Sequence, residues 1–260
     1  MKKEAFNVEL EGKVVVVTGA AGGQGAAEAF YMAKRGATVI AADIVKEPEW
    51  LDEAPSSISY FQLDIASEAS WCALATEISR SHKNIHGFVN NAGITNRARL
   101  NDIDLASFQK VMDVNLTGSL LGIQALSPLM NQGGSIVLVG SLASMTGHFP
   151  VAYTVSKWAV RGLARVASLE LGHLGIRVNI IHPGFIKTPM TATAPDAYLK
   201  HTLAENPLGR LGDVEDVSPT VSFLLSDNSS YISGAEIPID GGQSAHGGMK
   251  RLSDMAREDN

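Results

Sequence analysis

The sequence predicts a doubly wound α/β fold, in which one parallel sheet of about seven strands carries helices on both faces. Three observations support this prediction. Short runs rich in Val and Ile recur along the chain, as is typical of strands buried on both faces. Segments with a helical pattern alternate with these runs, which favours parallel pairing through helical crossovers. The chain has 260 residues and no repeat or domain-scale linker, so we expect a single domain over residues 1–260.

The composition argues against several kinds of partner and site. The net charge is −6 and no basic run is present, so we expect no nucleic-acid partner and no anionic membrane surface. No apolar run reaches the roughly 18 residues of a membrane span, and none follows Met1–Glu4. The single cysteine, Cys72, is expected to fill the core of a cytoplasmic protein. The histidines do not cluster with acids or Cys72, so no metal site is expected.

The first predicted strand, Lys13–Thr18, runs directly into a glycine-rich turn and then into an Ala-rich helix that ends near Gly36. This order of elements suits the pyrophosphate of a nucleotide, because glycines let backbone N–H groups approach it and the helix N-terminus adds partial positive charge. A plain tight turn is the alternative interpretation. The expected cofactor contacts in this segment are Gly19, Gly22, Gly23, Gln24 and Gly25.

The second predicted strand, Ala37–Ala42, ends at Asp43. A carboxylate there can accept hydrogen bonds from ribose hydroxyls and would repel a 2′-phosphate. No Arg or Lys lies in the glycine turn or directly after Asp43, which favours NAD over NADP. Asp43 could instead cap a turn. Ser59–Leu63 is a third strand, and Asp64 and Ile65 at its end are expected near the adenine.

The fourth predicted strand, residues 85–89, leads into Asn90–Gly93 at the carboxyl edge of the sheet, where ligands of α/β folds bind. A long helix is predicted from Leu105 to Met130. Asn115 lies in the middle of it, although Asn is a poor helix-interior residue. Asn115 is therefore either an exposed position without a role, or it holds water and a backbone kink near the site.

The fifth predicted strand, residues 134–140, is closed by Ser141, and a helix over 152–174 carries Tyr153 and Lys157. Positions i and i+4 share one face of a helix, so the phenol and the ammonium are expected side by side. A neighbouring cation favours phenolate, and we expect Lys157 and a positively charged cofactor ring to lower the pKa of Tyr153 toward neutrality. Tyr153 would then serve as a general base.

The remaining elements complete the sheet. Residues 175–181 form a sixth strand that ends in a structural His182, and residues 235–239 form the last strand. A helix is predicted over 214–225. Residues 188–207 are expected to form an irregular substrate lid. The polar C-terminal tail, residues 243–260, is expected to be loosely ordered or to pack on a neighbouring subunit.

These motifs, in this order and at these strand ends, resemble the short-chain dehydrogenase/reductase family over nearly the whole chain. The resemblance rests on Thr18-Gly19 with Gly23 and Gly25, on residues 90–93, on Ser141 with Tyr153 and Lys157, and on Pro183-Gly184 with Thr188. It implies a Rossmann-type fold, a catalytic set of Asn115, Ser141, Tyr153 and Lys157, and further cofactor contacts from Asn91, Ala92, Gly93, Tyr153, Lys157, Pro183, Gly184, Ile186 and Thr188.

Within the family, residues 156–163 and 182–191 are similar to bacterial 3α,20β-hydroxysteroid dehydrogenases and related cyclic-alcohol enzymes. The four-residue spacing of Tyr153 and Lys157 sets the chain apart from enoyl reductases of the same fold. Two features depart from many relatives: the interval between Ser141 and Tyr153 is one residue shorter, and Ser144 replaces a glycine. The expected substrate-pocket residues are Ser144, His148 and Met190.

The resemblance implies NAD-dependent, reversible oxidation of a bulky, hydrophobic secondary alcohol (cyclic, aryl or steroid-like) to the ketone. A carbonyl or 3-oxoacyl reductase working in the reductive direction is one alternative, and a non-catalytic, cofactor-sensing scaffold is another. The resemblance also implies a homotetramer, because the matching helices of relatives form subunit interfaces. Trp158 is expected in such an interface or in the core.

Overall fold

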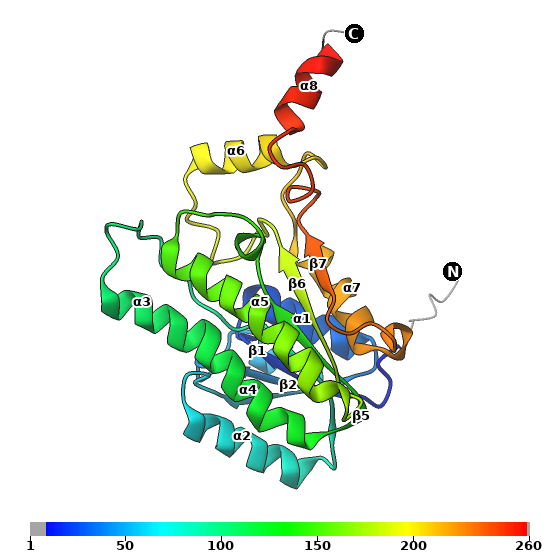
Figure 1. Ribbon diagram of the computed structural model, residues 1–260. Coiled ribbons are helices and arrows are strands. Elements are labelled where there is room, and N and C mark those ends of the chain that lie inside the picture. The colour runs from blue at the N-terminus through cyan, green and yellow to red at the C-terminus, as the bar shows by residue number, and fades with distance from the viewer. Residues whose placement is uncertain (1–8, 259–260) are drawn as a thin grey trace.

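The computed structural model describes residues 9–258, and Figure 1 shows one parallel sheet with helices on both faces. The N-terminal residues Met1–Glu4 and the last two residues of the tail lie outside this range. The sheet confirms the predicted fold class. In chain order its strands are β1 Val14–Thr18, β2 Thr38–Asp43, β3 Ile58–Gln62, β4 Ile85–Asn90, β5 Met130–Val139, β6 Arg177–Pro183 and β7 Glu236–Ile239.

The strand order, β3-β2-β1-β4-β5-β6-β7, reverses direction between β1 and β4. The chain first builds outward from β1 through β2 to β3, then returns to pair β4 on the other side of β1. The chain that leaves β1 therefore leads to β2 on one side, and the chain that leaves β4 leads to β5 on the other side. Such a switch point leaves a crevice in which ligands of open α/β sheets bind.

Helices cover both faces of this sheet (Figure 1). α1 packs against α7 on one face, while α2, α4 and α5 lie on the other. Within residues 9–258, none of the helices combines the length and apolar character that crossing a membrane requires. The helices are α1 Gly23–Lys34, α2 Glu68–Ser81, α3 Leu105–Met112, α4 Gly118–Leu126, α5 Val151–Gly172, α6 Asp196–Glu205, α7 Val214–Leu225 and α8 Lys250–Glu258, with short 3-10 turns at Leu51–Glu53, Ser127–Leu129, Leu142–Ser144 and Asp227–Ser229.

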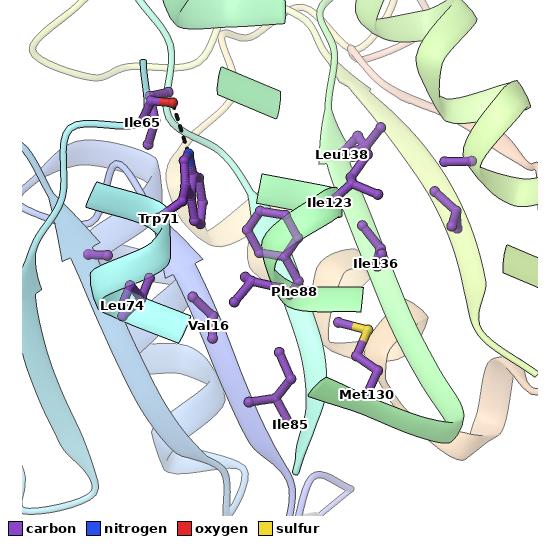
Figure 2. Packing of buried hydrophobic residues seen from close by; sticks show 14 of the residues in the cluster. Val16, Ile65, Trp71, Leu74, Ile85, Phe88, Ile123, Met130, Ile136 and Leu138 are labelled. Carbon is purple, nitrogen blue, oxygen red and sulfur yellow. Dashed lines mark hydrogen bonds between the residues drawn. The ribbon is translucent and has the colours of Figure 1, made fainter. Parts of the chain in front are cut away.

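The alternation of side chains along each strand divides the core into two layers. In β1, Val16 faces the layer beneath α2 and α4, whereas Val15 and Val17 face the layer beneath α1 and α7. Figure 2 shows the first layer, where the rings of Trp71 and Phe88 meet edge to face with centroids 5.9 Å apart. The Trp71 indole N–H donates to the Ile65 carbonyl at 2.9 Å, so its polar atom is satisfied although the residue is buried.

Asn115 lies in a π-helical segment, Asp113–Thr117, that joins α3 to α4. This π-helical turn is the backbone irregularity that we expected if Asn115 has a role near the site. Asn115 is buried, so the exposed alternative is wrong. The predicted helix also ends earlier than Met130, because Met130 already pairs with Ile85 as the first residue of β5.

Three further expectations need correction. The lid is not irregular throughout, because residues 196–205 form α6, whose start follows Pro195 in an extended conformation. The tail is not loosely ordered throughout, because residues 250–258 form α8, where Lys250 pairs with Asp254 one turn away at 2.5 Å. Cys72 is exposed rather than part of the core, because it follows the inward-facing Trp71 on α2 and points to solvent.

Gly122 of α4 provides a test of the packing between helix and sheet. A methyl group there would lie 2.8 Å from Trp71 Cη2 and 2.9 Å from Phe88 Cζ. We expect Gly122→Ala to lower the free energy of unfolding by about 1–3 kcal/mol, because overpacking outweighs the gain in helix propensity. Chemical denaturation measures this, with Gly172→Ala, whose methyl meets nothing within 4 Å, as the matched control. Equal effects of the two substitutions would contradict the packing shown in Figure 2.

Candidate active site

The carboxyl ends of β1 and β4 are joined by side-chain hydrogen bonds. The Asn91 amide donates to the Thr18 carbonyl at 3.0 Å, and the Ala92 N–H donates to the Thr18 hydroxyl at 3.2 Å. Gly25 lies against this junction, where a Cβ atom would collide with the Gly19 carbonyl and the Asn91 amide. Glycine at position 25 therefore serves close packing of the turn, and its contact with a cofactor remains a prediction.

The N-terminus of α1 is open to a ligand. Its N-cap is Gly22, which has no side chain to satisfy the first N–H groups, and the first turn carries no acidic residue. A Cβ atom on Gly22 would meet nothing within 4 Å. Unpaired N–H groups and the helix dipole attract an anion to such a position. This arrangement fits the pyrophosphate of a dinucleotide.

A cavity of about 330 Å³ begins at this helix terminus and extends along the strand ends to α5. We call it the cofactor cavity. Among the residues that line it, Lys157 is the one basic side chain. Most predicted cofactor contacts line this cavity: Gly19, Gly22, Gly23, Gln24, Asp43, Asn91, Ala92, Gly93, Tyr153, Lys157, Pro183, Gly184, Ile186 and Thr188.

Two predicted adenine contacts do not line the cofactor cavity. Asp64 is exposed, and its carboxylate accepts a hydrogen bond from the Ala66 N–H at 2.9 Å. The Ile65 side chain is buried in the core beneath α2. Contact between either residue and the adenine remains a prediction.

Asp43 and Trp50 fix the glycine turn from the outer side. The Asp43 carboxylate accepts hydrogen bonds from the Ala21 N–H at 3.0 Å and the Val45 N–H at 3.2 Å. The Trp50 indole donates to the Ala20 and Ala21 carbonyls at 3.0 and 3.1 Å. The sequence analysis did not identify Trp50, although an isolated Trp among polar residues was the available signal.

Lys157 is buried beneath the Tyr153 ring on α5. Its Nζ atom lies 5.8 Å from the centroid of that ring and donates to the Val139 carbonyl at 2.7 Å. Burial lowers the pKa of Lys157 to about 8, so the ammonium form still predominates at neutral pH. The structure thus brings together the predicted phenol and ammonium.

The pKa of Tyr153 is raised in the protein, contrary to the expected lowering. Burial of the phenol is the main cause, because it removes water that would solvate the phenolate. A hydrogen bond with the Ser141 side chain acts in the opposite direction and lowers the pKa. The sequence expectation placed part of the lowering on a positively charged cofactor ring, and the protein groups alone do not achieve it.

Ser141 is held by a compact turn at the end of β5. Its hydroxyl accepts from the Ala143 N–H at 3.1 Å, and its own N–H donates to the Ser144 hydroxyl at 3.3 Å. The buried Ser144 hydroxyl also lies 2.7 Å from His182 Nδ1. Ser144 thus lies behind Ser141 and not in a substrate pocket, so that expectation is wrong; a hydroxyl in place of glycine gives the turn a buried hydrogen-bond partner. His182 has the structural role that we expected.

Asn115 joins two segments of the site. Its amide donates to the Ile94 carbonyl and to the Ser156 hydroxyl, both at 2.9 Å, and its carbonyl accepts from the Ile94 N–H at 2.8 Å. A Cβ atom on Gly93 would lie 3.2 Å from the Asn115 side-chain oxygen and 3.6 Å from Lys157 Nζ. Asn115 and Lys157 therefore converge on Gly93. Ser156 is a further partner that the sequence did not identify.

A second cavity, of about 620 Å³, adjoins the cofactor cavity. We call it the outer cavity. Both cavities are lined by Ser141, Tyr153 and Met190, so the phenol and the serine hydroxyl lie at their junction. A molecule in the outer cavity can therefore reach the phenol while a cofactor fills the other cavity. His148 lines the outer cavity, as expected.

A cluster of aromatic rings forms part of the wall of the outer cavity. The rings of His148 and Phe149 have centroids 4.9 Å apart, and those of Phe185 and Tyr198 are 5.9 Å apart. Sequence reasoning missed Phe149, Phe185 and Tyr198, which lie in three separate segments and meet only in the folded chain. Among the described residues, no group of three or more His, Cys, Asp or Glu side chains is arranged to hold a metal ion.

Comparisons with known proteins agree with this geometry. A family model described as enoyl-(acyl carrier protein) reductase matches residues 19–244. The chain is 41% identical over 238 residues to a 3-alpha-(or 20-beta)-hydroxysteroid dehydrogenase from Mycobacterium tuberculosis, covering 90% of each chain. It is 35% identical over 252 residues to a trans-4-hydroxycyclohexanecarboxylate dehydrogenase from Sinomonas cyclohexanicum, covering 92% of this chain and 95% of the relative. It is 38% identical to the 3-oxoacyl-[acyl-carrier-protein] reductase FabG of Thermotoga maritima, covering 90% and 99%.

Solved structures give the same result. Levodione reductase superimposes with a TM-score of 0.85 at 33% identity, covering 91% of this chain and 99% of that one. A candidate 2-deoxy-D-gluconate 3-dehydrogenase from Agrobacterium tumefaciens, with bound NADP, gives 0.84 at 33% identity, covering 92% and 99%. With the family model matching most of the chain and these relatives matching nearly all of it, the protein belongs to the short-chain dehydrogenase/reductase family.

Proposed function

We propose that this oxidoreductase catalyses the NAD-dependent, reversible oxidation of a bulky secondary alcohol, cyclic, aryl or steroid-like, to the ketone. The observation that carries the proposal is the position of Tyr153 and Ser141 at the junction of the two cavities, with the Lys157 ammonium beneath the phenol. The relatives named as dehydrogenases of hydroxysteroids and of a hydroxycyclohexane carboxylate support a ring-bearing substrate. The aromatic wall of the outer cavity supports an apolar substrate body.

The protein's part in the reaction is proton transfer and charge stabilisation. Tyr153, as phenolate, accepts the proton of the substrate hydroxyl, and Ser141 donates a hydrogen bond to the same oxygen. The open N-terminus of α1 and the residues around it would hold the dinucleotide. NAD held there would supply a hydride acceptor.

Lys157 has two tasks in this mechanism. Its positive charge beneath the ring favours the phenolate and so opposes the effect of burial on the pKa of Tyr153. One ammonium proton is bonded to the Val139 carbonyl, and the others can bind hydroxyls of the nicotinamide ribose. Asn115 would hold a water molecule that links Lys157 to solvent, which provides a route for the released proton.

Asp43 supports NAD rather than NADP as the cofactor. Its carboxylate lies at the edge of the cofactor cavity, where it can accept hydrogen bonds from ribose hydroxyls and would repel a 2′-phosphate. The lining supplies no basic side chain near it to neutralise such a phosphate, since Lys157 belongs to α5 at the other end. Because one structural neighbour holds NADP, the choice needs a direct measurement.

A reductase acting on a 3-oxoacyl thioester is the second candidate, supported by the FabG relative. The reaction is reversible, so the same site serves either direction. Enoyl reduction is less well supported, because the tyrosine and lysine lie one helical turn apart on a common face. A non-catalytic scaffold would not need the complete set of Asn115, Ser141, Tyr153 and Lys157.

The assembly that we propose is a homotetramer. Val155, Trp158, Val166 and Leu169 form a stripe along α5 and are between 41% and 79% exposed. Gly162 lies within this stripe, and a Cβ atom there would meet nothing within 4 Å, so a second helix could approach closely. We also propose the cytoplasm as the compartment, because the lone thiol, Cys72, is exposed and suits a reducing environment.

The reaction is tested by following NADH formation with a panel of cyclic, aryl, steroid and 3-hydroxyacyl alcohols, and its reversal with the ketones. We expect turnover of at least one bulky class and a loss of at least about a hundredfold in kcat for Tyr153→Phe, because the general base is removed. Binding of NAD, measured by fluorescence, should change little. Tyr231→Phe, at a fully exposed position, is the matched control. Retained turnover in Tyr153→Phe would exclude this role for the phenol.

The cofactor assignment is tested with Asp43→Ala. We expect KM for NAD to rise on the order of tenfold, because charge-assisted hydrogen bonds to the ribose are lost. The preference for NAD over NADP should fall by a similar factor, because repulsion of the 2′-phosphate is removed. Asp52→Ala, in the nearby turn Leu51–Glu53, serves as the control. An unchanged NAD/NADP ratio of kcat/KM would show that Asp43 does not contact the ribose.

The assembly is tested by size-exclusion chromatography with light scattering. We expect a tetrameric mass for the unmodified chain and a smaller species for Leu169→Glu, because a charge would be buried in the interface. Leu51→Glu, outside α5, should leave the mass unchanged. A monomeric mass for the unmodified chain would exclude the proposed interface.

A further inference from the structure

The charged side chains that line the outer cavity are all basic. The lining includes the side chains of Arg97, Arg99, His148 and His201 but no Asp or Glu. The chain as a whole carries 27 acidic and 21 basic residues, with a net charge of −6. The cavity is therefore positive in a protein that is negative overall. A cleft lined by one sign of charge concentrates ligands of the opposite sign.

Hydrogen bonds to residues of the lid hold the Arg97 guanidinium at the outer cavity. Its guanidinium donates to the carbonyls of Met190 at 3.2 Å and Thr193 at 3.1 Å. Carbonyl oxygens satisfy the hydrogen bonds of the guanidinium but do not neutralise its charge. That charge also acts on Tyr198, whose pKa it lowers against the larger effect of burial.

Arg99 presents its guanidinium without a carboxylate partner. The guanidinium carbon lies 5.0 Å from the centroid of the Phe149 ring, which orients the planar group on the wall of the cavity. Within residues 9–258, neither Arg97 nor Arg99 forms an ion pair. In contrast, five other arginines of the same range do pair with carboxylates: Arg80, Arg161, Arg165, Arg210 and Arg257.

Different parts of the outer cavity carry different chemistry. Ser141 and Tyr153 lie where the two cavities meet, while Arg97 and Arg99 line the outer cavity alone and are exposed to solvent. The aromatic wall, with Phe149 and Tyr198 at 6.5 Å between ring centroids, lines the same cavity. A matching ligand has a hydroxyl for the junction of the two cavities, an apolar body for the aromatic rings and an anionic group for the solvent-exposed arginines.

We propose that the substrate is a hydroxy acid, a ring-bearing secondary alcohol with a carboxylate on the far side of the ring from the hydroxyl. Arg99 binds the carboxylate through its planar pair of N–H donors, which match the two carboxylate oxygens. Arg97 contributes charge and holds the lid near the bound acid. This inference rests on the proposed alcohol oxidation and specifies its substrate class.

The test compares 4-hydroxycyclohexanecarboxylate with its neutral methyl ester, as the ratio of their kcat/KM values. We expect the unmodified enzyme to favour the acid by about tenfold or more. Arg99→Ala should reduce the acid-to-ester ratio on the order of tenfold to a hundredfold, because the charge-assisted pair is lost. Arg99→Lys should recover part of the ratio, since it keeps the charge but not the planar pair. Arg80→Ala, which removes the same charge from the distant surface of α2, is the control and should leave the ratio unchanged.

A binding measurement separates this inference from the proposed reaction. Calorimetry with cyclohexanecarboxylate, which lacks the reactive hydroxyl, on the enzyme saturated with NADH should show binding that Arg99→Ala weakens by a similar factor. Equal kcat/KM values for the acid and the ester would overturn the inference and leave alcohol oxidation intact. The same holds if Arg99→Ala changes neither the acid-to-ester ratio of kcat/KM nor the calorimetric binding of cyclohexanecarboxylate. Preferred turnover of a 3-hydroxyacyl coenzyme A thioester would overturn it in favour of a phosphorylated carrier. Arg99-dependent binding of the acid, with no alcohol oxidised, would count against the proposed function alone.

Discussion

The close contact between the carboxyl ends of β1 and β4 is the constraint on which the site depends. Asn91 bonds to the Thr18 carbonyl, and Gly25 leaves no space for a side chain between the turn and this amide. The contact fixes the start of α1 and therefore the direction of its unpaired N–H groups. It also places Gly93 beside Asn115 and Lys157, so the same junction shapes the cofactor cavity on both sides.

The pKa values at the junction of the cavities express a balance between burial and charge. Burial raises the pKa of the Tyr153 phenol and lowers that of the Lys157 ammonium to about 8, so in each case it disfavours the charged form. The hydrogen bond with the Ser141 side chain acts against burial and lowers the pKa of Tyr153. Ser141 is itself fixed by its N–H, which donates to the buried Ser144 hydroxyl.

The start of the segment 188–207 borders both cavities. Met190 lines both cavities, and a Cβ atom on Gly23 of the glycine turn would lie 3.6 Å from the Thr188 side chain. Arg97 ties the same lid to the segment that follows β4. Residues 188–193 therefore contact both the glycine turn and the segment that follows β4.

Local patterns in the sequence determined the strands, the glycine turn, the acid at the end of β2 and the pairing of Tyr153 with Lys157, because each depends on residues that are near in sequence. The resemblance to a known family then supplied the roles of Asn115 and Ser141. The tertiary structure alone decided which side chains share a cavity. It placed Ser144 behind Ser141 and turned Ile65 into the core. It also brought the two arginines and the aromatic rings together in the lining of the outer cavity, the rings being those of Phe149, Phe185 and Tyr198. These groups come from segments far apart in the chain, and their burial and unpaired charge arise only when the sheet and the lid bring them together.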